Sequence, residues 1–201
     1  MGRLCSGCNE SGFSLVEVSI VTALMVILAI LGMPALQDYV IENKVPKVAS
    51  DLQRFVARMK VAALGGGSTP YERIDQRVLV NGLRGSSAIR ISGDTSSPVV
   101  AHGLGGQGTR GNGEIRVAPS ATPDSSNGSA FSLTLDHVNH AACPALISAL
   151  QRLASSVTVK GREGEVSVKQ LLANPPRPYE PLLADAQCER GDSNEFVFVF
   201  K

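Results

Sequence analysis

The sequence predicts an α+β protein in which one long N-terminal helix precedes a domain built on an antiparallel sheet. Residues 13–33 form an apolar stretch in which Glu17 is the only charged residue. Farther along the chain, residues 141–154 have the apolar spacing of a second helix. Short segments with the alternation of strands lie on both sides of it: 77–80, 88–91, 114–118, 130–136, 156–160, 165–168 and 195–200. The last segment is apolar on both faces, which predicts a strand inside the sheet, and four prolines between residues 175 and 181 predict an extended, non-helical segment. A long helix followed by these mixed elements is typical of an α+β fold.

The apolar stretch is long enough to cross a membrane. As an α-helix it would extend roughly 31 Å at ~1.5 Å per residue, which is about the thickness of the hydrocarbon core of a bilayer. Glu17 is the exception within it, because a carboxylate in hydrocarbon costs at least ~2.5 kcal/mol. Either this carboxyl lies near the interface, protonated or reached by water, or it pairs with a cation of another protein chain.

The helix is expected to continue over residues 34–64 as an amphipathic segment. Apolar residues recur there every three or four positions and should pack on the rest of the domain: Val45, Val48, Leu52, Phe55, Met59 and Ala62. Pro34 lacks a backbone donor and Gly32 adds backbone freedom, so we expect a kink near these two residues. The uncovered first half of such a helix is stable only in lipid or in a bundle of like helices.

The start of the apolar stretch resembles the processing site of type IV pilins and pseudopilins. Gly12 is followed by Phe13 and, four residues later, by Glu17, at the head of an apolar helix. The resemblance implies that a prepilin peptidase removes residues 1–12 and that Phe13 becomes the N-methylated first residue of the mature chain. Cleavage also creates an amine at Phe13, which is normally protonated near neutral pH. Glu17 of a neighbouring subunit is the implied counter-ion of that amine.

Two of the four cysteines, Cys143 and Cys188, lie on the side of the predicted span that the resemblance places in the periplasm. An even pair in an oxidising compartment indicates a disulfide, and two buried free thiols are the alternative. The strand and cysteine-bearing helix over residues 132–150, with the final apolar strand after Cys188, resemble the C-terminal disulfide-bounded region of type IVb pilins. Cys5 and Cys8 form a CxxC within the predicted leader, without a second ligand pair nearby, so we expect no metal or redox role there.

Charge and motifs give no support for a nucleic-acid-binding protein or an enzyme, and no cofactor or metal is expected. The formal net charge is +1. His137 and His140 have HxxH spacing without an evident third ligand, and His102 stands alone, so ordinary surface or capping histidines are the preferred interpretation. Residues 103–108 have the form GxGxxG, but the glycines that follow cannot open the helix that a dinucleotide-binding motif requires.

The resemblance therefore implies a type IVb pilus subunit, in the type IV pilin fold, that polymerises with copies of itself for adhesion, aggregation or related roles. Residues 1–12 would be the leader, 13–33 the membrane and filament-core half of the helix, 34–64 its packed half, and 65–201 the globular domain.

Before assembly the chain would span the bacterial inner membrane once, with its domain in the periplasm, and afterwards it would lie in an extracellular filament. The implied partners are itself, the prepilin peptidase and the inner-membrane pilus or secretion machinery. A pseudopilin of a type II secretion system and a minor pilin are alternatives. A monomeric membrane-anchored periplasmic binding module is an alternative of a different class.

Overall fold

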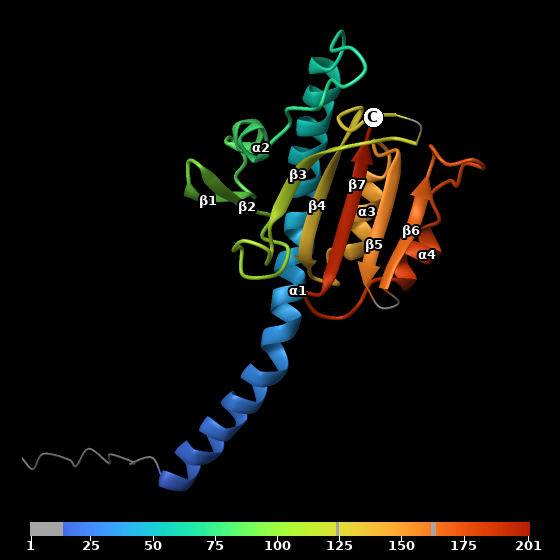
Figure 1. Ribbon diagram of the computed structural model, residues 1–201. Coiled ribbons are helices and arrows are strands. Elements are labelled where there is room, and N and C mark those ends of the chain that lie inside the picture. The colour runs from blue at the N-terminus through green and yellow to red at the C-terminus, as the bar shows by residue number, and fades with distance from the viewer. Residues whose placement is uncertain (1–13, 124, 162–163) are drawn as a thin grey trace, which may run out of the picture. The chain divides into compact units, whose positions relative to one another are not determined.

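A computed structural model describes residues 14–123, 125–161 and 164–201 of the chain. The described backbone divides into two units, one that ends at Gln37 and one that covers Asp38–Lys201. Helix α1 (Leu15–Ala62) contributes to both units (Figure 1). The first unit holds the apolar half of this helix, and every sheet of the described chain belongs to the second unit.

The second unit is organised on a five-stranded antiparallel sheet with strand order β3-β4-β7-β5-β6. Its strands are β3 (Ile115–Ser120), β4 (Ala130–Val138), β5 (Ser156–Gly161), β6 (Gly164–Gln170) and β7 (Asn194–Phe200). Figure 1 shows β7, the last strand of the chain, between β4 and β5. The apolar residues on both faces of 195–200 predicted a strand inside the sheet, and this prediction is confirmed.

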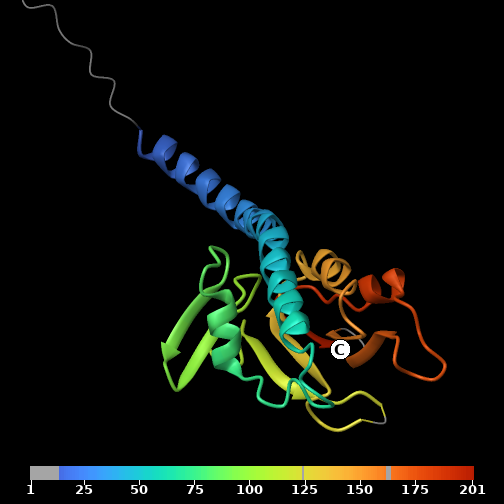
Figure 2. The ribbon, with the colours of Figure 1, turned by 90° about the horizontal axis from the view of Figure 1, so that it is seen from above.

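The second half of α1 and α3 (Cys143–Leu150) pack side by side against one face of this sheet (Figure 2). Phe55 of α1 meets Phe131 of β4 edge to face, with ring centroids 6.3 Å apart. The side-chain amide of Gln53 donates a 2.8 Å hydrogen bond to the carbonyl of Ala149, which holds the two helices together. All three phenylalanines of β7 are buried in the resulting core: Phe196, Phe198 and Phe200.

The amphipathic pattern of the second half of α1 is largely confirmed. Val45, Val48, Leu52 and Phe55 are buried, and Met59 is partly buried against the core. Ala62, at the end of the helix, is exposed, so the predicted apolar face ends one turn earlier than the spacing suggested.

Two lysines satisfy carbonyl groups at the C-terminal end of α3. The ammonium of Lys60 donates to the carbonyl of Leu153 at 3.1 Å, and that of Lys169 donates to the carbonyl of Gln151. Gln151 is the C-cap of α3, and carbonyls at a helix C-terminus have no partner within the helix, so the Lys169 bond satisfies this end of α3. Leu153 lies in the turn that follows the helix. Burial lowers the pKa of both lysines, and for Lys169 the nearby charge of Lys60 adds to the effect.

Residues 65–112 contain a helix where a β-like segment was predicted. The alternation of residues 77–80 suggested a strand, but they lie in α2 (Gln76–Leu83). Asp75 caps this helix by accepting the Val78 N–H at 3.0 Å, and Leu79 and Leu83 are buried on one face. Cap and burial together outweigh the local alternation. The other predicted segment, 88–91, overlaps β1 (Arg90–Asp94), which pairs with β2 (Ser97–Ala101) in a separate two-stranded sheet.

The proline-rich segment near residue 180 also ends differently from the prediction. An extended segment was expected through Pro181, whereas α4 (Pro181–Ala186) begins at this residue. Proline suits the first helical position because its missing N–H would have no partner there. Helix α3 is shorter than the predicted range of 141–154, since the chain leaves the helix after Leu150.

Candidate functional site

The apolar half of α1 exposes its large side chains on every side of the helix. Between Leu15 and Leu31 these side chains are between 49% and 88% exposed. The helix is long and apolar enough to cross a membrane. Fully burying one such side chain is worth ~1.5–3 kcal/mol, so this segment favours lipid or apolar partner helices over water.

Glu17 is the polar residue of this segment whose side chain has no partner in the described ranges. The hydroxyls of Ser19 and Thr22 are satisfied within the helix, because they donate to the carbonyls of Val16 and Val18 at 2.8 and 2.7 Å. The Glu17 carboxyl makes neither a hydrogen bond nor an ion pair with residues 14–123, 125–161 or 164–201. Its position and its lack of a partner fit a role between chains better than a role within one.

Three of the residues predicted around this helix cannot be placed with the same detail. Gly12 and Phe13, the predicted cleavage and methylation residues, lie outside the described residues. The side chain of Pro34 is outside the description as well, although α1 is helical from Leu15 to Ala62 and so passes through Gly32 and Pro34. The kink at Gly32 and Pro34 stays a prediction.

The predicted disulfide between Cys143 and Cys188 is present, with the two Cα atoms 5.9 Å apart. Cys143 is the first residue of α3 and is fully buried, whereas Cys188 follows α4 and is partly buried. The bond therefore joins the start of α3 to the segment just after α4, and these two positions flank the β5–β6 hairpin in sequence. Several side chains between the two cysteines are exposed, including Leu171 and Leu182.

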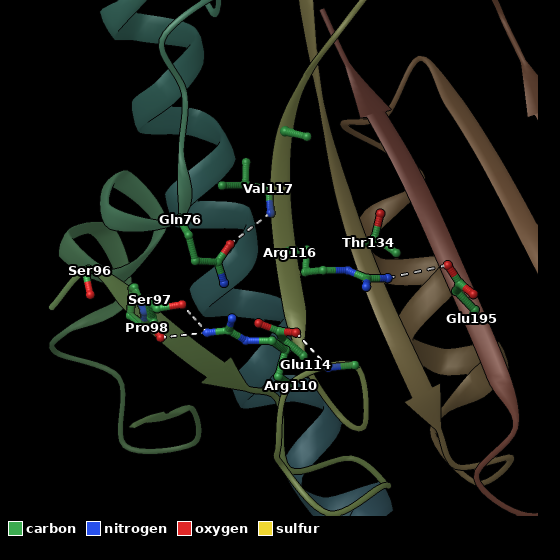
Figure 3. Close-up of a pocket in the computed structure, with 12 residues that line it drawn as sticks. Gln76, Ser96, Ser97, Pro98, Arg110, Glu114, Arg116, Val117, Thr134 and Glu195 are labelled. Carbon is green, nitrogen blue, oxygen red and sulfur yellow. Dashed lines mark hydrogen bonds and ion pairs between the residues drawn. The ribbon is translucent and has the colours of Figure 1, made fainter. Parts of the chain in front are cut away.

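A polar groove of about 620 Å³ lies where β3 meets the β1–β2 hairpin and α2 (Figure 3). Arg110 donates to the backbone carbonyl of Ser97 at 2.9 Å. Arg116 lies 3.8 Å from a carboxylate oxygen of Glu195 across the sheet. The carboxylate of Glu114 accepts the Gly111 N–H at 2.9 Å. Each charged side chain named here already makes a hydrogen bond or an ion pair within the chain.

The three histidines make different contacts and do not form a metal-ligand set among the described residues. His102 is buried, with Nε2 2.7 Å from the carbonyl oxygen of Asp136 and Nδ1 accepting the Leu104 N–H at 3.0 Å. Burial lowers the pKa of His102. His140 faces Asp38 at 3.8 Å. Among the residues that the structure describes, no group of three or more His, Cys, Asp or Glu side chains is placed to hold a metal ion.

The glycine-rich loop at residues 103–108 joins β2 to β3 and is followed by a strand. A dinucleotide-binding turn opens a helix whose N-terminus meets the phosphates. No helix begins at this loop, so the structure does not support the interpretation of residues 103–108 as a dinucleotide-binding motif. Sequence reasoning did not single out the polar groove, since its charged residues come from segments far apart in the chain and share no short motif.

Comparison with known proteins gives a family match at the end of the chain opposite to the processing motif. Residues 109–201 match the family model described as PilS N terminal. A comparison with curated proteins found no match. Among solved structures, a type IV b pilin from Salmonella typhi is 16% identical, with 78% of this chain and 96% of that chain covered and a TM-score of 0.47. TcpA, a type IV pilin from Vibrio cholerae El Tor, is 12% identical, with coverages of 79% and 99% and a TM-score of 0.48.

The long helix, the antiparallel sheet and the Cys143–Cys188 disulfide are features that the resemblance to type IV pilins implied. The family whose pattern this chain shares over residues 109–201 is PilS.

Proposed function

We propose that this chain is a type IVb prepilin whose N-terminal helix, after cleavage between Gly12 and Phe13, forms the core of a surface filament. The observation that carries the proposal is the apolar half of α1, with exposed side chains on all sides and Glu17 unpaired among the described residues. A helix of this kind needs an apolar environment throughout its length. Lipid provides it before assembly, and neighbouring copies of the same helix provide it afterwards.

Glu17 would set the axial register between neighbouring helices. In the proposed filament its carboxylate pairs with the amine that cleavage frees at Phe13 of another subunit. Both charges would lie among apolar side chains, where removing one partner of a buried pair costs about 3–5 kcal/mol. This pairing explains why an acidic side chain is placed in an apolar stretch, since a membrane anchor by itself gains nothing from it.

The second unit would form the surface of the filament, with the region from Cys143 to Cys188 available for contacts with neighbouring subunits or other surfaces. Its exposed leucines, Leu171 and Leu182, support a contact role for this region. In the inner membrane the same unit would lie in the periplasm, where the disulfide can form. The prepilin peptidase and an inner-membrane assembly machinery are the partners that this route requires.

The mature N-terminus is the first measurement that tests the proposal. Mass spectrometry of protein from cell membranes should find N-methylated Phe13 as the first residue. Electron microscopy of sheared surface material, with the main subunit identified by mass spectrometry, separates a pilus from the alternatives. A pseudopilin or minor pilin would be processed but would not be the main subunit of long filaments, and a membrane-anchored binding module would stay monomeric.

A substitution at Glu17 tests the pairing. We expect Glu17→Val to leave the processed monomer in the membrane and to abolish or severely reduce filaments, because the Phe13 amine would lose its counter-ion. Glu42→Val is the matched control, since Glu42 is an exposed acidic residue in the same helix and makes no ion pair within the described ranges. Normal filaments from Glu17→Val would refute the pairing.

A further inference from the structure

Three cationic side chains line one pocket of the second unit. Lys44 and Lys47 come from α1 and Arg90 is the first residue of β1, and with the glycine-rich loop at 103–108 they border a volume of about 500 Å³. All three side chains are exposed. No aspartate or glutamate lines the pocket, and none of the three cations makes an ion pair within residues 14–123, 125–161 and 164–201.

The contrast with the polar groove of Figure 3 shows why these cations matter. In the groove, Arg116 lies between the carboxylates of Glu195 and Asp136, at 3.8 and 3.7 Å. Lys44 and Lys47 are three residues apart on one helix, so their side chains are neighbours and their like charges repel. An anion bound between these lysines and Arg90 would offset this repulsion, so the arrangement of the three cations favours anion binding.

One acidic residue, Asp192, touches the glycine-rich loop. Asp192 accepts the Gly106 N–H at 2.9 Å and the side-chain amide of Asn139 at 2.6 Å, so both of its oxygens are already hydrogen-bonded. It holds the loop in place and is not among the residues that line the pocket. Gly106 has a positive φ of 64°, and a Cβ there would lie 2.7 Å from the backbone nitrogen of Gly113, so a glycine is required for the loop to pack against its own backbone.

We propose that this pocket binds a phosphate group, carried either by free phosphate or by the headgroup of an anionic phospholipid. Two ammonium groups and one guanidinium fork provide charge-assisted hydrogen bonds to several phosphate oxygens at once. No aromatic side chain lines the pocket, so it offers no stacking surface for a nucleobase. The proposal goes beyond the filament function and does not depend on it, since it uses only residues of the second unit.

A lipid headgroup is a chemically reasonable source of the phosphate, because the two lysines of the pocket follow the apolar stretch closely in sequence. Only ten residues lie between Met33 and Lys44. Basic residues that follow a membrane span are attracted to anionic lipid headgroups. The same three cations would bind phosphate from solution through the same contacts, so the two sources must be separated by experiment.

Lysine footprinting of the full chain tests the site directly. The chain is purified in neutral detergent micelles and treated with an amine-acylating reagent, and labelling at each lysine is quantified by mass spectrometry at constant ionic strength. Inorganic phosphate at ten times its Kd should slow labelling of Lys44 and Lys47 by about tenfold. Lys160 and Lys201 are exposed lysines outside the pocket and should label at an unchanged rate.

Arg90→Gln tests whether the three cations act together, because it removes one of them and keeps both reporter lysines. Protection of Lys44 and Lys47 should then require at least several-fold more phosphate. Arg152→Gln is the matched control, since Arg152 is exposed, lies outside the pocket and makes no ion pair in the described part of the chain. In this control, phosphate should protect Lys44 and Lys47 at the same concentration as in the unsubstituted chain. If both variants require the same phosphate concentration for protection, the three-cation site is overturned.

The lipid source is tested in phosphate-free buffer with the chain in nanodiscs of phosphatidylcholine, with or without phosphatidylglycerol. Slower labelling of Lys44 and Lys47 with phosphatidylglycerol assigns the site to a lipid headgroup. Protection by free phosphate without an effect of phosphatidylglycerol assigns it to a soluble phosphate, and both results support the proposal. Unchanged labelling under both conditions, or equal protection of Lys160, would overturn it.

Discussion

Replacing both Cys143 and Cys188 with alanine should remove a large share of the stability of the second unit. The disulfide joins residues 45 positions apart, and the closed loop contains α3, β5, β6 and α4. In the chain-entropy model a cross-link over a loop of this length stabilises the native state by about 4 kcal/mol, mainly by restricting the unfolded chain. Total stabilities of domains are about 5–15 kcal/mol, so the expected loss is large.

Alanine is the better replacement because Cys143 is fully buried. A serine there would bury a hydroxyl, which costs about 1–3 kcal/mol if it finds no partner, and this cost would be confused with the loss of the cross-link. With alanine at both positions, the change in the free energy of unfolding reports mainly on the loop.

Urea denaturation of the full chain in detergent micelles, followed by far-ultraviolet circular dichroism, measures this change. The unsubstituted chain unfolded under reducing conditions should match the double variant, because both lack the cross-link. Cys5→Ala with Cys8→Ala is the control for cysteine replacement, since neither residue belongs to the loop. If the double variant and the oxidised chain differ by less than about 1 kcal/mol, the loop-entropy reasoning is wrong.

Two further predictions concern packing and pH. Gly161→Ala should destabilise the second unit by about 1–3 kcal/mol, since the added Cβ would overlap the backbone carbonyl of Gln187. Gly85→Ala is the control and should leave the stability unchanged, because nothing lies within 4 Å of its added Cβ. Equal urea midpoints for the two variants would contradict the predicted overlap. Burial lowers the pKa of His102, so as the pH falls below about 6.5 the unfolded imidazole gains a proton that the buried one does not, and the free energy of unfolding should decrease. Between pH 7.5 and 5.5 this decrease should be about 1 kcal/mol larger in the unsubstituted chain than in His102→Gln, and equal decreases in urea unfolding would refute the assignment.

Much of the fold and part of the site follow from local sequence patterns. The apolar stretch and the spacing from Val45 to Phe55 predicted both halves of α1, because helix periodicity and burial agree there. The apolar residues on both faces of β7 predicted its place inside the sheet, and the family resemblance gave the Cys143–Cys188 pair. Each of these features is encoded by residues close together in the sequence or by a small number of cysteines.

The errors lie in short segments where alternation or composition competes with a helix-starting residue and with burial. Residues 77–80 alternate like a strand, yet the cap at Asp75 and the burial of Leu79 and Leu83 make them part of α2. At Pro181 the proline-rich composition suggested continued extension, while the chain begins α4 there. In both places local preference is weak, so tertiary packing determines the outcome.

By itself, the sequence determines that one half of a long helix is apolar on every side and contains a single acidic residue, because these properties belong to consecutive residues. Only the tertiary structure decides which charges are neutralised and which are left open. It pairs Arg116 with Glu195 across the sheet, and it places Lys44 and Lys47 on the same pocket as Arg90 without an acidic neighbour in its lining. Such encounters depend on how strands and helices pack, and side chains many residues apart have no local pattern that records them.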